Sequence, residues 1–146
     1  MAAKRFDLNS CMMFITTRSS KLFATKFNQA LKTENIARSE WMSLFYIDQH
    51  QPLTQRQLSD LVGITGPSMV KVINKLVTRE LIISEQSRTD KRERLISLTA
   101  DGERLLKETL PIASQFQDAV TDGISQRDLD KVADVMDKMV ENASKL

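Results

Sequence analysis

The sequence predicts a mainly α-helical chain with one small β-hairpin, and three observations lead to this fold class. Apolar residues recur every three or four positions over most of the 146 residues, the period of an amphipathic helix. Residues 81–99 are instead rich in leucine and isoleucine around a polar turn, which is typical of paired strands. At 41 % hydrophobic and 27 % charged, the composition is that of a folded globular chain. The length fits a single domain over residues 1–146.

Two helices are expected before Pro52. Apolar residues keep helical spacing from Leu8 to Leu31, so a long first helix is predicted there. Ser39 can cap a second helix through its side-chain oxygen. This helix is expected to stop near His50, because a proline disfavours a helical conformation at the residue before it.

A helix-turn-helix is predicted next. Thr54 can cap a short third helix, which ends near Gly63. Thr65 can cap a fourth helix that has Pro67 in its first turn, where the missing N–H costs nothing. The inward stripe of this fourth helix is expected to contain Met69, Val70, Ile73, Leu76 and Val77, with Val72 on the solvent side.

The chain beyond residue 79 is expected to form a hairpin and two long helices. The strand segments LIISEQ and ERLISLT flank the polar and basic turn SRTDKR. Thr99 can cap a helix that runs to about Ile124 and bends at Pro111, and Ser125 can cap a last helix. A helix-turn-helix followed by such a hairpin is a winged helix-turn-helix, which is predicted to form a head over residues 36–100.

This arrangement suits duplex DNA, because the second helix of a helix-turn-helix fits the major groove. The amino end of that helix offers free N–H groups and a positive dipole end, which attract phosphate. The basic hairpin tip suits phosphates or a narrow minor groove, whose negative potential favours arginine. The candidate DNA-binding residues are Thr65, Gly66, Pro67, Ser68, Lys71, Asn74, Lys75, Arg88, Asp90, Lys91, Arg92 and Arg94.

The distribution of charge supports this partner class more than its total does. The net charge is only +2. Residues 1–35 carry +4, 36–53 carry −1, 54–94 carry +3 and 95–146 carry −4, and these values sum to +2. A basic head next to an acidic tail favours nucleic acid as the partner of the head. The alternative is a winged-helix module that binds proteins and no DNA.

Other classes of protein find little support. One histidine and one cysteine argue against a His/Cys metal site within one chain. No Gly-rich phosphate loop and no Ser–His–Asp set can be nominated, so neither an enzyme nor a cofactor is expected. No apolar run reaches the roughly 18 to 20 residues of a membrane helix, and a lone cysteine fits a reducing cytoplasm.

Two segments resemble the MarR family of bacterial transcription regulators. LTQRQLSDLVGITGPSMVKVINKLVTRELI looks like the DNA-binding helices of that family, and DKRERLISLTADG looks like its wing signature. The signature is Asp-x-Arg before a strand that ends Leu-Thr-x-x-Gly, matched here by Asp90, Arg92, Leu98, Thr99 and Gly102. The resemblance implies a homodimeric repressor of near-palindromic operators. By this analogy Arg92 enters the minor groove with Asp90 orienting it, while the fourth helix reads the major groove.

Two positions depart from the family pattern. Glu80 stands where the family usually has glycine after the reading helix, so a left-handed conformation there would be strained. Ser84 stands where a basic residue is common, which implies fewer contacts with the DNA backbone near the base of the wing. Neither departure touches the hairpin tip or the reading helix.

The resemblance also implies a response to a small aromatic or phenolic effector, or to an oxidant. The residues expected to line an effector site are Met12, Ile15, Trp41 and Phe45; alternatively they are core residues. Cys11 resembles the reactive cysteine of the peroxide-sensing branch of the family, although Tyr46 is the only tyrosine here to match the tyrosines that branch uses. The alternative for Cys11 is a buried inert thiol.

The terminal helices, 6–32 and 101–146, are expected to form a dimerisation region. Their apolar stripes are too long to be buried against one small head. A second copy of the chain is therefore expected to cover them with two-fold symmetry. The alternative is a monomer whose terminal helices fold back as a bundle.

Overall fold

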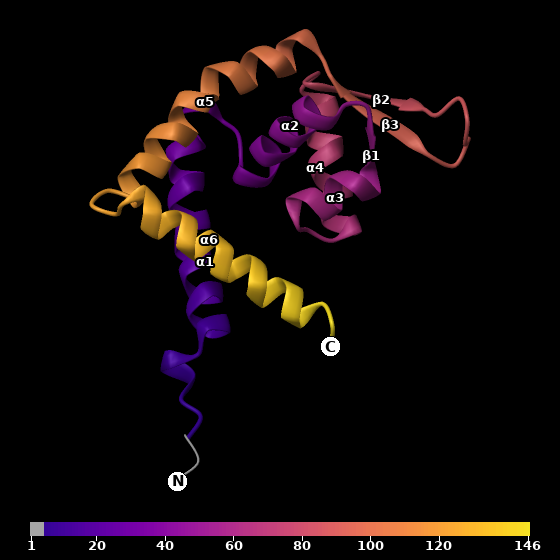
Figure 1. Cartoon of the computed structure of the whole chain (residues 1–146). Helices are drawn as coiled ribbons and strands as arrows, with labels where there is room; N and C mark the ends of the chain where they lie inside the picture. The colour runs from indigo at the N-terminus through magenta and orange to yellow at the C-terminus, as the bar shows by residue number, and fades with distance from the viewer. Residues whose placement is uncertain (1–4) are drawn as a thin grey trace. The chain divides into compact units, whose positions relative to one another are not determined.

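The computed structural model describes residues 5–146, and residues 1–4 of the predicted domain lie outside the described part. Contacts divide the chain into two compact units. The first unit ends at Ala113 and the second spans Ser114–Leu146. Figure 1 shows the elements of each unit, which are described separately.

The first unit contains most of the elements and the second contains one complete helix. In chain order the elements are the 3-10 turn Leu8–Ser10, α1 (Met12–Leu31), the 3-10 turn Lys32–Glu34, α2 (Arg38–His50), β1 (Leu53–Thr54), α3 (Gln55–Val62), α4 (Gly66–Thr78), β2 (Ile82–Gln86), β3 (Arg94–Leu98), α5 (Ala100–Val120) and α6 (Gln126–Ala143). Helix α5 crosses from the first unit into the second. The predicted fold class, mainly helical with a small hairpin wing, is confirmed.

Helix starts follow the predicted caps at four places. The side-chain oxygens of Thr54, Thr65, Thr99 and Ser125 each accept a hydrogen bond from the backbone N–H three residues ahead. Each bond satisfies one of the N–H groups that the first turn of a helix leaves without a partner. These local sequence signals therefore fix where four of the helices begin.

The first two helices begin differently from the prediction. Helix α1 starts at Met12, after the short 3-10 turn, rather than at Leu8. The prediction that Ser39 caps α2 is wrong, because Ser39 lies inside the helix and Ala37 is the capping residue. The Glu40 carboxylate reaches back to accept the N–H of Ala37 at 3.0 Å, which is the half of a capping box that does not depend on a polar side chain at the N-cap.

A third strand joins the predicted hairpin. Strands β2 and β3 pair antiparallel, with Ile82 opposite Leu98 and Gln86 opposite Arg94. Strand β1 adds to the free edge of β3 through the pair Leu53 and Ile96, giving the order β1-β3-β2. A two-residue strand has too few positions to show alternation, so only its tertiary pairing reveals it.

The core of the first unit lies where α2, α3 and α4 meet the sheet. Leu44, Leu58, Met69, Leu76 and Ile96 are fully buried there. The burial of these large apolar side chains is the main term that holds the helix-turn-helix to the base of the hairpin.

An aromatic group connects α1, α2 and α5 within the first unit. The Trp41 ring meets Phe27 edge-on with ring centroids 5.4 Å apart and stacks on Phe45 at 5.9 Å. The indole N–H donates to Oγ1 of Thr109 on α5 at 2.7 Å, and that hydroxyl donates to the carbonyl of Leu105. The buried polar atoms of this cluster are therefore hydrogen-bonded, as buried polar groups need to be.

The base of the hairpin is joined to α5 by backbone contacts. Thr99 donates its N–H to the carbonyl of Leu81 at 3.1 Å and its hydroxyl to the carbonyl of Glu80 at 2.6 Å. Gly102, in the first turn of α5, lies so close that a Cβ there would be 2.0 Å from the Leu81 oxygen. Glu80 has a φ of 58°, the left-handed conformation in which its side chain is strained.

The second unit consists of the end of α5, a turn at Gly123 and helix α6. Gly123 has a φ of 77°, which suits the turn between the two helices. Helix α6 carries Leu129, Met136 and Met139 on one partly covered stripe, with charged residues elsewhere. Among residues 5–146, no helix is both long enough and apolar enough to span a membrane.

Candidate nucleic-acid interface

The helix-turn-helix is held by reciprocal capping and a tight turn. The backbone N–H of Thr54 donates to Oε1 of Gln57 at 2.9 Å, and the N–H of Gln57 donates back to the Thr54 hydroxyl at 3.2 Å. Gly63 ends α3 with a φ of 79°, a conformation that glycine adopts without steric cost. Three residues later α4 starts, so the amino end of α4 is fixed with respect to α3.

The amino end of α4 is open to solvent. Thr65, Gly66, Pro67 and Ser68 are all exposed. The Thr65 hydroxyl accepts the N–H of Ser68 at 3.3 Å and also lies 3.0 Å from the Ser68 hydroxyl. This end combines the positive end of the helix dipole with polar hydroxyl groups, which is the chemistry of a phosphate contact.

The exposed face of α4 differs from the prediction at three valines. Lys71, Asn74 and Lys75 are exposed as expected. The prediction for Val72 is wrong, since it is only 8 % exposed and belongs to the core. Val70 and Val77 were expected inside, yet both are exposed. The buried face is formed by Met69, Val72, Ile73 and Leu76, a stripe narrower and slightly rotated compared with the predicted one.

The hairpin tip is ordered by polar side chains. The buried hydroxyl of Ser87 accepts the N–H groups of Thr89 and Asp90, each at 3.3 Å. The Asp90 carboxylate accepts the N–H of Arg92 at 2.9 Å and its guanidinium Nε–H at 3.3 Å. The Arg92 side chain itself is 92 % exposed. Asp90 therefore orients an arginine that remains free to contact a partner.

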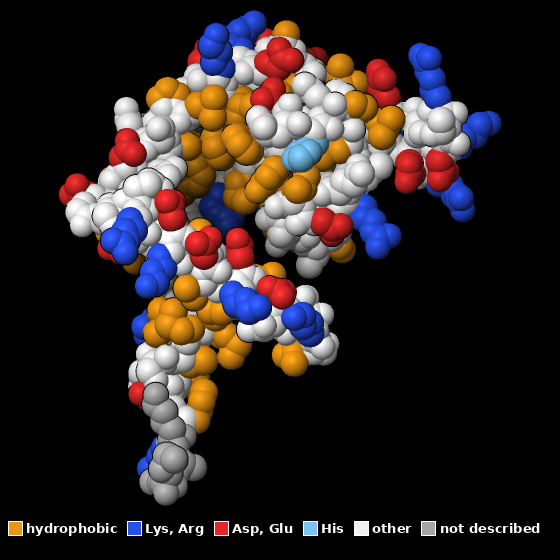
Figure 2. Space-filling model, in the orientation of Figure 1, with side chains coloured by type: hydrophobic (Ala, Val, Ile, Leu, Met, Phe, Trp, Pro, Cys, Tyr) orange, Lys and Arg blue, Asp and Glu red, His pale blue; other side chains and the backbone are white. Residues whose placement is uncertain are grey.

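The other basic residues of the hairpin are also placed by the turn. Gln86 donates its amide to the carbonyl of Lys91 at 2.7 Å. The Arg94 guanidinium crosses to the neighbouring strand and donates to both the hydroxyl and the carbonyl of Ser84. Arg88 and Lys91 are exposed. Figure 2 shows lysine and arginine side chains projecting from the hairpin in several directions, with carboxylates among them.

One groove joins α4 to the hairpin. It encloses about 1020 Å³ and is lined by Thr65 and Gly66 from the start of α4 and by Arg92 and Arg94 from the hairpin. The structure thus brings together two sets of predicted residues that are more than twenty positions apart in the chain. The groove is lined by three arginines, by two carboxylates (Asp60 and Glu93) and by apolar side chains such as Ile64 and Ile73.

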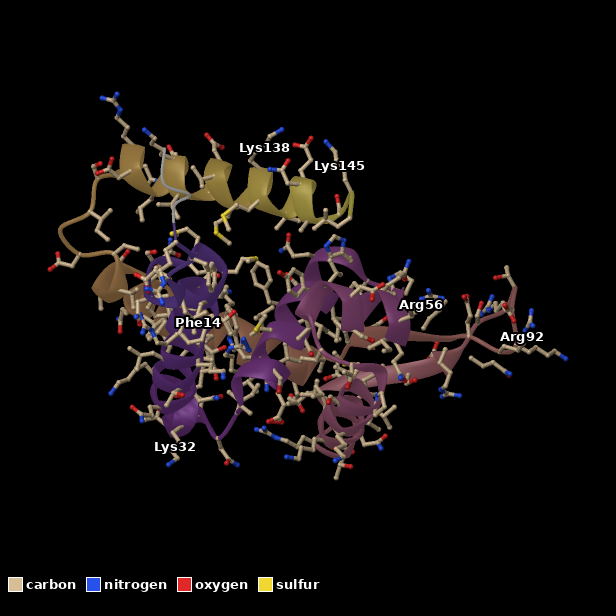
Figure 3. The ribbon with its side chains drawn as sticks, turned by 90° about the horizontal axis from the view of Figure 1, so that it is seen from below. Phe14, Lys32, Arg56, Arg92, Lys138 and Lys145 are labelled. Atoms are coloured by element: carbon tan, nitrogen blue, oxygen red, sulfur yellow. The ribbon has the colours of Figure 1, made fainter. Side chains whose placement is uncertain are left out.

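The same groove contains a residue that sequence reasoning missed. Arg56, in the first turn of α3, lines it and is exposed. In Figure 3, Arg56 and Arg92 lie on the side of the first unit from which the hairpin projects. A lone arginine in a helix carries no local signal for this role, although its position just after the Thr54 cap of the helix-turn-helix could have suggested it.

The residues expected to line an effector site are only partly brought together. Trp41 and Phe45 stack on one another in the aromatic group. Met12 and Ile15 lie about 22 Å and 18 Å along α1 from Phe27, the α1 residue that packs against Trp41. Within one chain, therefore, these four side chains do not line a common pocket.

Cys11 and His50 both lie at helix ends. Cys11 is partly buried and precedes α1, where its carbonyl accepts the N–H of Ile15. His50 is the last residue of α2, as predicted, and its ring stacks on Tyr46 with centroids 6.4 Å apart. In the described part of the chain, no group of three or more His, Cys, Asp or Glu side chains is arranged to hold a metal ion.

The fold and this surface define a winged helix-turn-helix protein. The model of the MarR family matches residues 34–93, so the resemblance found in the sequence is confirmed for this segment. The match covers the segment from the turn before α2 to the end of the hairpin tip.

Solved structures of other proteins share the fold over nearly the whole chain. A MarR family transcriptional regulator from Silicibacter pomeroyi DSS is 23 % identical, with a TM-score of 0.82 over 95 % of this chain and 93 % of that one. MepR from S. aureus, solved with DNA, is 22 % identical, with a TM-score of 0.81 over 90 % and 98 %. BpsR from Bordetella bronchiseptica, whose DNA binding is regulated by 6-hydroxynicotinic acid, is 18 % identical, with a TM-score of 0.84 over 94 % and 98 %.

Proposed function

We propose that this protein is a cytoplasmic, non-catalytic transcriptional regulator, a repressor that binds near-palindromic DNA operators as a homodimer. The observation that carries the proposal is the groove where the amino end of α4 meets Arg92 and Arg94 of the hairpin. A helix that enters the major groove and an arginine that reaches the neighbouring minor groove need this relative placement. The DNA complex of MepR, which shares the fold, supports the same partner class.

Each part of the surface has a distinct role in this proposal. The N–H groups and hydroxyls at Thr65, Gly66 and Ser68 bind phosphate, next to Pro67, which shapes the first turn. Asn74 faces base edges, where an amide can pair with adenine. The lysines Lys71 and Lys75 and the basic residues Arg56, Arg88, Lys91 and Arg94 neutralise phosphates.

Arg92 reads the minor groove in this proposal. Its guanidinium is exposed, and the hydrogen bonds from its N–H and Nε–H to Asp90 limit the directions it can take. A narrow minor groove concentrates negative potential, which attracts an arginine inserted into it. The hairpin therefore adds a contact beyond the reach of α4.

A second copy of the chain covers the apolar faces of the terminal helices. Met13 and Leu22 on α1, and Val132 and Val140 on α6, are exposed although each is apolar. Several exposed apolar side chains on one helix are typical of an interface. The helices 6–32 and 101–146 would pack against their copies about a two-fold axis, which matches the symmetry of a palindromic operator. Sedimentation at micromolar concentration should show a dimer, and a monomer would contradict this part of the proposal.

A small aromatic effector, phenolic or related, releases the DNA in this proposal. The support is that 6-hydroxynicotinic acid regulates the DNA binding of BpsR, which has the same fold. Since Met12 and Ile15 lie far along α1 from Trp41 and Phe45, an effector is expected to contact one of these pairs rather than all four residues of one chain. A thermal-shift panel of phenolic and aromatic acids tests this, and no shift with any compound would contradict it.

Oxidation of Cys11 is the alternative release signal. Cys11 is only partly buried, so an oxidant can reach it. Hydroperoxide sensitivity of DNA binding that persists in a Cys11→Ser variant would rule this alternative out.

The central experiment measures DNA affinity against salt. A fluorescent palindromic duplex from the promoter of the chain's own gene is titrated at several salt concentrations. If six or more phosphates are neutralised by the two heads, affinity should fall by about 10³-fold or more between 50 and 200 mM salt. Weak binding that does not change with salt would contradict DNA binding and favour a protein-interaction module.

A further inference from the structure

Helix α4 carries two valines that are exposed to the same extent. Val70 and Val77 are each 42 % exposed, although neighbouring apolar residues of α4 are buried. Neither side chain can donate or accept a hydrogen bond. In water this exposed apolar area is unfavourable, so a partner that covers it would gain free energy.

Val70 lies closer than Val77 to the end of α4 that borders the groove. It is in the amino-terminal half of the helix, one turn from Gly66 and one turn from Asn74. Successive residues are about 100° apart around a helix axis, which places Val70 on the same side as Gly66 and Ile73. Both of those residues line the groove between α4 and the hairpin. Val77 is about 10 Å further along the helix, away from this end.

Thymine is the base whose chemistry fits an exposed valine. It alone presents a methyl group, at C5, in the major groove, whereas the other three bases present only hydrogen-bond donors and acceptors there. A valine beside such polar edges would leave them unpaired. A valine beside a thymine methyl removes apolar surface of both groups from water.

We propose that Val70 determines sequence specificity by packing against the 5-methyl group of one thymine in each operator half-site. This inference rests on the proposed function, since it needs α4 to lie in the major groove. It adds a base preference that is read by apolar contact alone. Asn74, one turn further along α4, would read a neighbouring base by hydrogen bonds.

The experiment removes one methyl group from the DNA at a time. The full-length chain first selects its preferred duplex from a random pool. Each thymine of that duplex is then replaced, symmetrically in both half-sites, by deoxyuridine, which lacks only the 5-methyl group. One thymine position should show a loss of about fourfold in affinity per half-site, the effect expected for one buried methyl group. The other thymines should show little change.

Two protein variants then assign the effect to a residue. In Val70→Ala the thymine and deoxyuridine duplexes should bind equally well, because the contact is already lost. Val77→Ala removes the same atoms from an equally exposed valine of the same helix, and it should keep the full sensitivity to deoxyuridine. Thermal melting of both variants checks that each remains folded.

The possible outcomes separate this inference from the proposed function. Equal affinity for thymine and deoxyuridine at every position, or a selected operator without thymine, would overturn the role of Val70 while DNA binding stands. The same conclusion follows if Val70→Ala keeps the sensitivity, or if Val77→Ala abolishes it. Failure of the wild-type chain to select any sequence would overturn the proposed function, and this inference with it.

Discussion

The two ends of the hairpin are held by different forces. At the base, Leu81, Ile82 and Leu98 are buried, and Gly102 lies against the Leu81 carbonyl. At the tip, Ser87 is buried but Arg88, Lys91 and Arg92 are exposed, and the turn is ordered by hydrogen bonds to Ser87 and Asp90. Packing therefore fixes where the hairpin leaves the head, and polar contacts fix how its tip is shaped.

This difference explains why the wing signature contains such different residues. Asp90 and Arg92 belong to the tip, where one orients the other. Thr99 and Gly102 belong to the base, where they join β3 and α5 to Leu81. Substitutions at the base should therefore change stability, and substitutions at the tip should change DNA binding. Four predictions test this separation, from the largest expected effect to the smallest.

The base should tolerate no side chain at Gly102. A Gly102→Ala substitution would place a Cβ 2.0 Å from the Leu81 oxygen, so β2 or α5 must move. We expect the free energy of unfolding to fall by about 3 kcal/mol, measured by urea denaturation. In the control Gly66→Ala, where a Cβ would meet nothing within 4 Å, it should change by less than about 1 kcal/mol. Equal effects in both variants would contradict the packing argument.

Arg92 at the tip should contribute to DNA affinity but not to the stability of the fold. Removal of the Arg92 side chain by Arg92→Ala deletes a charge-assisted contact with DNA, so operator affinity should fall by about thirtyfold, or about 2 kcal/mol. The thermal midpoint should stay the same, because the exposed ion pair with Asp90 contributes little to folding. Fluorescence anisotropy with the operator duplex measures the first and thermal melting the second.

Arg104 is the matched control for Arg92. Arg104 is also exposed and also paired, with Asp101 at 2.9 Å, but it is on α5, outside the groove. The Arg104→Ala variant has the same loss of charge and should retain operator affinity within about twofold. An equal loss of affinity in both variants would indicate that only net charge matters.

The order of the tip should depend on Ser87. In Ser87→Ala the N–H groups of Thr89 and Asp90 lose their acceptor, which should cost about 1 kcal/mol. Hydrogen exchange should therefore become faster at these two amides and stay unchanged at the base of the hairpin. Thr89→Ala removes the hydroxyl that lies 3.1 Å from the Ser87 hydroxyl but leaves the acceptor of both amides in place, so exchange at Asp90 should change less than in Ser87→Ala. Unchanged exchange in Ser87→Ala would show that the turn does not need this hydroxyl.

Strain at the base should be relieved by glycine at position 80. Glu80 has a φ of 58°, which costs a residue with a Cβ about 1 kcal/mol. We expect Glu80→Gly to raise the free energy of unfolding by up to about that amount, as measured by urea denaturation. Glu80→Ala keeps the Cβ and should leave the stability unchanged. If alanine also stabilised the protein, the cause would be the lost negative charge and not relief of backbone strain.

The helix starts that could be predicted from the sequence are those determined by residues close together in the chain. Thr54, Thr65 and Ser125 each mark a helix start, because a cap hydrogen bond joins residues three positions apart. Strand β1 could not be predicted, since its two residues are a strand only through pairing with β3. The prediction of Ser39 as the cap is wrong because α2 begins at Arg38, after an alanine that carries no polar cap signal.

The sequence predicts most residues of the candidate interface, but not the groove in which they come together. The exposed lysines of α4 and the basic tip follow from helical period and turn composition. The groove that joins them, and the place of Arg56 in it, depend on how α3 and the hairpin pack. The exposure of Val70 was missed because the helical period alone fixes the centre of a buried stripe only to within about one residue. That missed residue is the one that suggests a base preference.

The bond between Trp41 and Thr109 has a practical consequence. This chain contains a single tryptophan, and its indole is buried while it donates to a residue of α5. The tryptophan fluorescence of the protein therefore comes from one site, where α2 meets the first half of α5. Any movement of α5 against α2 will change the polarity around that ring and shift its emission. The chain thus carries its own optical reporter for the step by which a signal would reach the DNA-binding head.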